Sequence, residues 1–160
     1  MTWRRLKRVI ACDIFVDAAL GAVHSNKTMT SPFLSLPTDR HVASNALAFA
    51  IRDGFPVSPG HTLIVPRRLV ASWFEATREE QVAMLELLDA VRAQLDAELH
   101  PDGYNIGINV GPAAGQTVMH LHMHLIPRFI GDVPDPRGGI RHVIPGKGNY
   151  LVPADETEQS

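Results

Sequence analysis

A short segment in which histidine alternates with apolar residues places the strongest constraint on how this chain can fold. Residues 120–124 read His-Leu-His-Met-His, and two further apolar residues follow them. Successive side chains of a β-strand point to opposite faces of a sheet, so a strand would align His120, His122 and His124 on one open face. Leucine and methionine would lie on the other face, against a core. The alternation predicts a strand over residues 118–127.

The strongest helix pattern covers residues 78–99. Thr77 and Glu80 form a capping-box pattern at its start, and a His-Pro-Asp-Gly sequence ends it. Apolar residues recur within it at three- and four-residue spacing, which predicts one apolar stripe. The stripe consists of Val82, Leu85, Leu88, Val91 and Leu95.

Three further apolar runs are typical of short strands. They cover residues 46–51, 61–65 and 104–110, and turns that contain glycine or proline separate the first two. The order of strands and helix, with hairpin-like connections, predicts an α+β fold. In that fold an antiparallel sheet packs one face against the long helix.

Composition limits the class of protein. The chain has 160 residues, 45% of them hydrophobic and 20% charged, which suits one globular domain. The formal net charge of −2 argues against a broad basic field for nucleic acid, and no apolar run approaches the roughly 18 residues of a membrane span. Cys12 is the only cysteine, so no disulfide can form within the chain. A free thiol suits a reducing cytoplasm.

Three aligned imidazoles are a poor way to build a core, because each buried ring needs hydrogen-bond partners. Two chemistries fit them. Three histidines can hold a catalytic zinc ion. Alternatively, a neutral imidazole can attack phosphorus while its neighbours donate hydrogen bonds to the oxygens. A reference pKa of about 6.5 allows neutral and charged imidazoles to coexist near neutral pH.

The loop before the histidines favours the phosphorus chemistry. Residues 115–117 read Gly-Gln-Thr and offer flexible backbone, an amide and a hydroxyl. Backbone N–H groups and small polar side chains bind phosphate. The same loop alone is equally compatible with a plain connection between strands.

Residues 115–126 resemble the signature of the histidine-triad (HIT) superfamily of nucleotide hydrolases and transferases. Residues 53–66 resemble that family's earlier hairpin, which supplies a fourth histidine, and the likeness, which includes Asn109, covers about residues 31–145. Residues 131–139 are similar to the tail of a prokaryotic branch that resembles diadenosine-polyphosphate hydrolases. The resemblance implies a five-stranded antiparallel sheet. It also implies a HIT domain over residues 31–145, which leaves an N-terminal extension (1–30) and a C-terminal tail (146–160).

The resemblance also implies roles for four histidines. His122 would be the nucleophile and form a nucleotidyl-imidazole that water then hydrolyses. His124 would contact the phosphate and assist the leaving group. His120 would orient His122, partly through its backbone carbonyl, and His61 would complete the imidazole network.

The implied substrate contacts lie in the same motifs. Asp53 would bind ribose hydroxyls, although a turn aspartate before a glycine is an equally good interpretation from the sequence. Purine contacts would come from apolar residues near Phe33 and Ile51. Asn109 could also be only a polar strand position. The phosphate site would be lined by Asn109, Gly115, Gln116 and Thr117.

Two departures limit what the family resemblance implies. Leu69 occupies a position where many members carry histidine, and because that position is peripheral we expect little effect on the chemistry. Some relatives bind a structural zinc ion through paired cysteines near the N-terminus, whereas Cys12 stands alone. We therefore expect no metal site and no required cofactor, although a divalent cation could enter with a polyphosphate substrate.

The leading functional prediction is cleavage of dinucleoside polyphosphates at the α-phosphate, through a covalent nucleotidyl-histidine. A purine nucleoside phosphoramidase, a non-catalytic nucleotide-binding protein and a zinc hydrolase that uses the three histidines stay as alternatives. Sheet edges need cover, so we also expect a homodimer. We expect no membrane or nucleic-acid partner and a cytoplasmic location.

Overall fold

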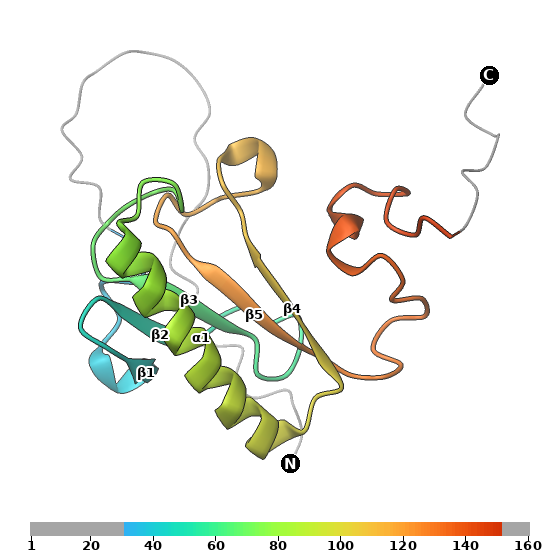
Figure 1. Cartoon of the computed structure of the whole chain (residues 1–160), viewed down its shortest axis with the longest axis horizontal. Coiled ribbons are helices and arrows are strands. Elements are labelled where there is room, and N and C mark those ends of the chain that lie inside the picture. Colours follow the sequence, from blue (N-terminus) through green and yellow to red (C-terminus); the bar gives the residue numbers. More distant parts are fainter. Residues whose placement is uncertain (1–30, 152–160) are drawn as a thin grey trace. The chain divides into compact units, whose positions relative to one another are not determined.

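A five-stranded antiparallel sheet with one long helix forms the framework of residues 31–151, the part of the chain that the computed structural model describes (Figure 1). The strands lie in the order β1-β2-β3-β5-β4. The α+β fold expected from the sequence is therefore confirmed, and the expected N-terminal extension lies outside the described residues. The strands are β1 (His41–Ser44), β2 (Ala48–Arg52), β3 (Thr62–Pro66), β4 (Gly103–Ile108) and β5 (Met123–Arg128).

Helix α1 (Arg78–Leu99) has the bounds that the sequence predicts. Its capping box is present: Thr77 Oγ1 accepts from the Glu80 N–H (3.3 Å), and the Glu80 carboxylate accepts from the Thr77 N–H (2.8 Å). The predicted apolar stripe is wrong at its N-terminal end, where Val82 and Leu85 are 39% and 40% exposed. At this end, the face that meets the sheet is shifted from Val82 and Leu85 to the neighbouring positions Ala83 and Met84. It consists of Ala83, Met84, Leu87, Val91 and Leu95.

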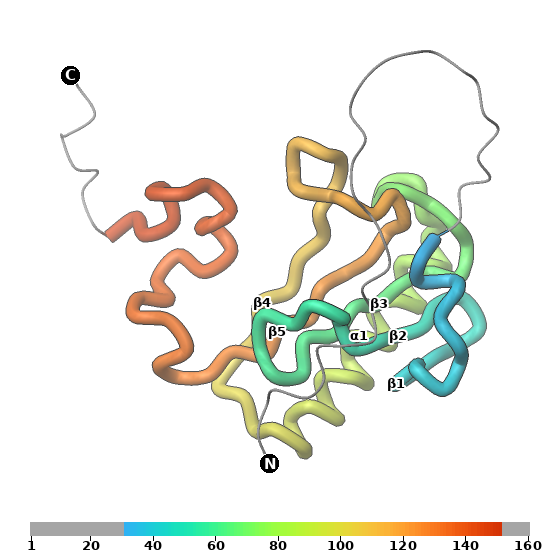
Figure 2. Tube along the Cα trace, turned by 180° about the vertical axis from the view of Figure 1, so that it is seen from behind, coloured from blue at the N-terminus to red at the C-terminus, as the bar shows by residue number. Residues whose placement is uncertain are grey.

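Apolar side chains lie on both faces of the sheet. The face toward α1 carries Ala50, Ile64 and Leu125. The opposite face carries Phe49, Ile51, Leu63 and Val65, which Phe33 and Leu36 of the preceding segment cover. Figure 2 shows this segment on the side of the sheet away from α1. Residues 31–36 are therefore part of the folded domain.

The observed strands differ from the predicted ones in two places. The sequence did not predict strand β1, because its four residues form no apolar run. The strand predicted over 118–127 begins only at Met123, since the ladders to β3 and β4 both end there, at Ile64 and Ile108. Before that point the chain bonds to the β3–α1 connection instead: the Leu121 N–H donates to the Val70 carbonyl (2.6 Å).

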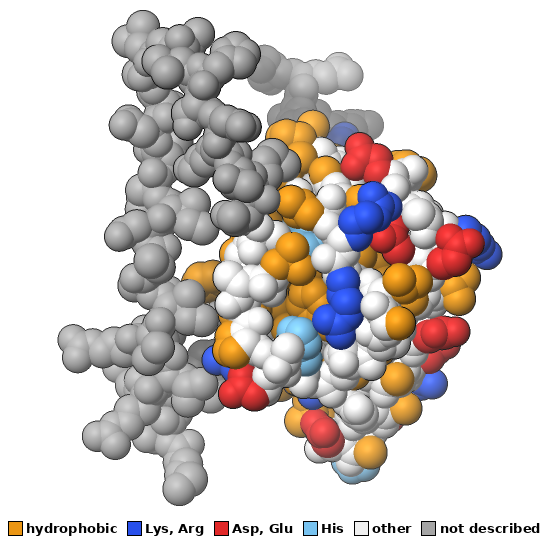
Figure 3. All heavy atoms as spheres, turned by 90° about the vertical axis from the view of Figure 1, so that its left-hand side faces the viewer, with side chains coloured by type: hydrophobic (Ala, Val, Ile, Leu, Met, Phe, Trp, Pro, Cys, Tyr) orange, Lys and Arg blue, Asp and Glu red, His pale blue; other side chains and the backbone are white. Residues whose placement is uncertain are grey.

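The surface and the helices give two further observations. On the face that Figure 3 shows, basic and acidic side chains of the described residues are interspersed rather than gathered in patches of one sign. Within residues 31–151, no helix combines the length and the apolar character that a membrane crossing requires.

Candidate functional site

Two of the predicted histidines lie where β5 begins. His124 is paired with Leu63 of β3, on the face of the sheet away from α1, and His122 directly precedes the strand. The His122 Nδ1–H donates to the backbone carbonyl of His120 (2.7 Å). A carbonyl oxygen only accepts, so this contact fixes the proton of the neutral ring on Nδ1. The other nitrogen, Nε2, therefore carries the lone pair.

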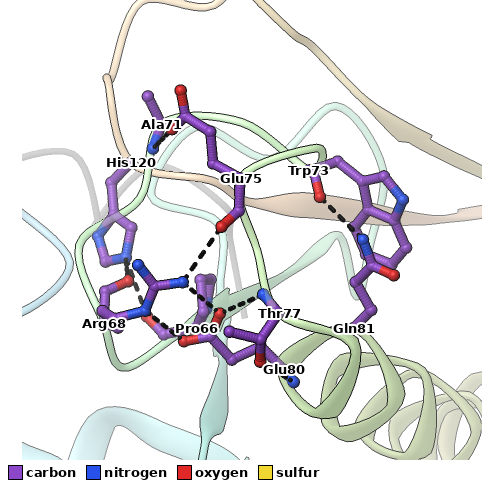
Figure 4. A network of polar contacts seen from close by, with 9 residues as sticks. All are labelled: Pro66, Arg68, Ala71, Trp73, Glu75, Thr77, Glu80, Gln81 and His120. Atoms are coloured by element: carbon purple, nitrogen blue, oxygen red, sulfur yellow. Dashed lines mark hydrogen bonds and ion pairs between the residues drawn. The ribbon is translucent and has the colours of Figure 1, made fainter.

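His120 does not lie on an open face with the other two, so this part of the prediction is wrong. It is wholly buried, because the chain has already left the sheet before Met123. Its Nε2 lies 2.9 Å from the Pro66 carbonyl and 3.1 Å from the Arg68 carbonyl (Figure 4). Its Nδ1 lies 2.6 Å from Ser31 Oγ. Both ring nitrogens of His120 are therefore used inside the protein.

His61, the residue before β3, meets His124. The His61 Nε2 lies 2.9 Å from His124 Nδ1, and the rings of His124 and His122 meet edge to face with 5.1 Å between centroids. The Val57 N–H donates to His61 Nδ1 (3.4 Å), and Asp53 Oδ2 lies 3.4 Å from the same nitrogen. In the hydrogen bond between His61 and His124, one ring donates and the other accepts. The rings of His61, His124 and His122 thus form a contiguous group.

Burial favours the neutral forms of His61, His120 and His124. It lowers the pKa of His61, against the opposing charge of Asp53, and it lowers the pKa of His120. Burial, together with positive charge on His122 or His61, lowers the pKa of His124 to about 4. The lowered pKa values therefore favour the neutral form of these three rings.

Asp53 follows β2 and faces His61. Its Oδ2 lies 3.4 Å from His61 Nδ1, and its Oδ1 accepts from the Phe55 N–H (2.8 Å). The side chain is 14% exposed. Asp53 thus has the turn role that the sequence allowed, and it also supplies a negative charge beside the imidazole pair.

The three triad histidines do not converge on one point that an ion could occupy. Both nitrogens of His120 contact protein atoms, and Nδ1 of His122 contacts a carbonyl. Among the described residues, the group with the right donor atoms close together is instead Asp53, His61 and His124, within 4.8 Å of one another. The zinc alternative built on all three triad histidines is therefore wrong.

Gln116 organises the loop before the triad. Its side chain is buried; its Oε1 accepts from the Gly111 N–H (2.8 Å), and its Nε2 donates to the carbonyls of Ala71 (2.7 Å) and Val118 (3.2 Å). To contact phosphate, this amide would have to release those partners. The contribution of Gln116 visible in the structure is the shape of the loop.

The other expected phosphate residues are accessible. Asn109 follows the Ile108–Met123 pair of the β4–β5 ladder, so it lies opposite His122, and its side chain has no hydrogen-bond partner among residues 31–151. Gly115 and Thr117 are exposed. These backbone and side-chain groups are free to meet an anion.

The sequence pointed to Phe33 but not to its neighbour Ser31. The ring of Phe33 meets that of His122 edge-on, with 5.2 Å between centroids, and Phe33 also packs against the cluster that contains Ile51. Ser31 contacts His120, 89 residues away along the chain. A single serine in a turn carries no spacing signal, so only the three-dimensional structure reveals it.

The domain that contains these contacts is similar to known proteins. A family model, the HIT domain, matches residues 37–131. Relatives include the AP-4-A phosphorylase of Mycobacterium tuberculosis, 30% identical over 115 residues, which cover 68% of this chain and 59% of that protein. Another is the bis(5'-adenosyl)-triphosphatase of Dictyostelium discoideum, 37% identical over 82 residues, which cover 51% of this chain and 55% of that one.

A solved structure agrees with these relatives. The crystal structure of a HIT family protein from Bacillus anthracis is 34% identical, covers 57% of this chain and 65% of that one, and superposes with a TM-score of 0.55. The matched share of each of these three proteins is below two thirds of its length. The matching domain includes β1 to β5, α1 and all four histidines of the site. The chain therefore belongs to the HIT family.

Proposed function

We propose that the protein cleaves dinucleoside polyphosphates at the α-phosphate, with His122 as the nucleophile. The observation that carries this proposal is the hydrogen bond from His122 Nδ1 to the His120 carbonyl. It leaves the Nε2 lone pair of the neutral ring free, as an attacking imidazole requires. The rings of His61 and His124 are already held beside His122, so little reorganisation of them is needed when charge develops.

The reaction has two displacements. In the first, His122 Nε2 forms a bond to the α-phosphorus, and the electron pair of the breaking P–O bond goes to the departing phosphate. The Nε2–H of His124 donates a hydrogen bond to that oxygen. In the second, a water oxygen attacks the same phosphorus, the N–P bond breaks, its electrons return to Nε2, and the water proton goes to solvent.

The substrate site would use the accessible polar groups around His122. Asn109, Thr117 and the backbone of Gly115 would hold the phosphate oxygens, and Asp53 would contact the ribose. The bond from the Phe55 N–H uses Oδ1 of Asp53, while Oδ2 faces the imidazole pair. The ring of Phe33 would form part of the wall beside the purine.

The names of the relatives support this substrate class. One is named a phosphorylase of AP-4-A and the other a bis(5'-adenosyl)-triphosphatase. The two names differ in the group that completes the reaction, phosphate or water, whereas the attack by an imidazole is compatible with both. A phosphoramidase would also share this step and would differ in the leaving group.

A substrate panel tests the proposal. Diadenosine polyphosphates and adenosine phosphoramidates are compared at matched concentration, with and without inorganic phosphate, and the products are identified. The proposal predicts adenosine monophosphate from the diadenosine substrates, with no requirement for phosphate. Faster turnover of phosphoramidates would favour the alternative leaving group. Binding without turnover of any substrate would contradict the proposed activity.

A further inference from the structure

A buried pair of polar side chains lies behind the nucleophile, outside the groups that would touch substrate. Ser31 is 5% exposed and His120 is wholly buried, and Ser31 Oγ lies 2.6 Å from His120 Nδ1. Buried polar groups need partners, and no buried side-chain nitrogen or oxygen in the described part of the chain lacks one. The contact therefore has a defined donor and a defined acceptor.

The direction of the proton follows from the other contacts. The Pro66 and Arg68 carbonyls can only accept, so His120 carries its proton on Nε2. Its Nδ1 must then accept, and the Ser31 hydroxyl must donate. The hydroxyl oxygen also accepts from the Phe33 N–H (3.2 Å), which fixes the serine within its own turn.

The opposite side of the His120 ring is anchored as firmly. The guanidinium of Arg68 donates to the two carboxylate oxygens of Glu80 (2.8 and 2.7 Å), and Glu80 closes the capping box of α1 (Figure 4). The carbonyls that receive the His120 proton are therefore held by the helix terminus. Ser31 holds the ring from the other side.

We propose that Ser31 is a positioning residue for the reaction: its hydroxyl holds His120 so that the His120 carbonyl keeps the proton of His122 on Nδ1. The route runs from Ser31 Oγ to the His120 ring, through the His120 peptide to its carbonyl, and from there over 2.7 Å to His122. The inference rests on the function proposed above, because His122 must be the attacking group for this position to matter.

Phe33 connects the same turn to the nucleophile a second time. Its ring contacts those of His120 and His122, with centroids 5.9 and 5.2 Å away. Since the Phe33 N–H is bonded to Ser31 Oγ, the serine sets both the support behind His122 and the aromatic wall beside it. A segment that precedes the first strand thus takes part in the site.

Three variants of the full-length chain separate positioning from simple packing. Ser31→Ala removes the donor, Ser31→Thr keeps a hydroxyl, and Ser35→Ala is the matched control. Ser35 lies in the same segment, is exposed and donates only to the Pro32 carbonyl. We expect Ser31→Ala to lower kcat by roughly 10- to 100-fold, since small misplacements in an active site can cost about a hundredfold. KM should change by less than about threefold, because the groups that touch substrate are intact, and the threonine and control variants should stay near wild type.

Histidine ring ¹⁵N NMR gives a readout that does not depend on activity. In the wild-type protein the neutral rings should show the proton on Nε2 of His120 and on Nδ1 of His122. Ser31→Ala should mix the two tautomers of His122, while Ser31→Thr should restore the wild-type pattern.

A wild-type His120 with its proton on Nδ1 would overturn the inference, even if Ser31→Ala did not fold. So would an unchanged His122 tautomer and unchanged kcat in a folded Ser31→Ala protein. The two proposals separate if the His122 tautomer changes when the Ser31 hydroxyl is removed and returns in Ser31→Thr, while the wild-type protein turns over no nucleotide. That result would contradict the proposed function and support the positioning role of Ser31.

Discussion

Acidification should destabilise this fold in a way that can be traced to His124. Desolvation of the partly buried ring, together with positive charge on His122 or His61, lowers the pKa of His124 from about 6.5 to about 4. The unfolded chain therefore binds a proton at higher pH than the folded one. The resulting stability is fully present above pH 6.5 and is lost as pH falls toward 4.

The magnitude follows from the two pKa values. The whole shift from about 6.5 to about 4 corresponds to ~3 kcal/mol, at about 1.4 kcal/mol per unit. Between pH 7.5 and pH 5, the portion lost from His124 alone is ~2 kcal/mol. The lowered pKa values of His61 and His120 add to this in the same direction.

Urea unfolding at the two pH values measures the effect. With a slope of about 1–3 kcal/mol per molar urea, the unfolding midpoint should fall by roughly 1 M or more at pH 5. His124→Gln should show a smaller pH dependence, by ~2 kcal/mol. The control is His142→Gln, at an exposed position near the C-terminal end of the described residues. It should keep the pH dependence of the wild-type protein. An unchanged pH dependence in His124→Gln would refute the account of a neutral, partly buried imidazole.

Three further perturbations test other parts of the account. Asp53→Ala should weaken binding of the nucleotide product about tenfold or more, since a hydrogen bond to a charged group contributes ~1.5–3 kcal/mol. Calorimetry measures this affinity. An unchanged affinity would mean that Asp53 is only a turn residue. Gly60→Ala should cost ~1–3 kcal/mol in urea unfolding, because φ is +81° and a Cβ would lie 2.7 Å from two leucines of α1. Gly54→Ala, where no atom lies within 4 Å of a Cβ, is its control. Light scattering should give about twice the chain mass of 17.5 kDa, because the edge strand β4 would pair with that of a second copy. Ile106→Lys on that strand should shift the mass toward the monomer. A wild-type monomer at micromolar concentration would contradict the dimer.

Local patterns predicted the parts of the fold that depend on neighbouring residues. Helix α1 and its capping box follow from Thr77 and Glu80, three residues apart. Leu121, Met123 and Leu125 lie on the helix side of the sheet, as the alternation predicts. These features depend on geometry within a few residues, and sequence spacing describes that geometry well.

The parts that the sequence did not reveal depend on distant contacts. The buried ring of His120 contacts Ser31, the carbonyl of Pro66 at the end of β3 and the carbonyl of Arg68 just after it, each more than 50 residues away. The contact of His61 with His124 joins residues 63 apart. Family resemblance suggested that second contact, whereas no spacing rule could have predicted it.

The identity of the nucleophile tests the central claim most directly. A rapid quench without acid, during turnover of a diadenosine polyphosphate, should preserve the N–P bond. Mass spectrometry of the peptide that contains residues 119–128 should then locate one nucleotidyl group on His122. His122→Ala should lose this adduct and at least ~10³-fold in kcat, the scale observed when other catalytic nucleophiles are removed, while it still binds substrate. A label on His124 or His61, or near-normal turnover by His122→Ala, would contradict the account.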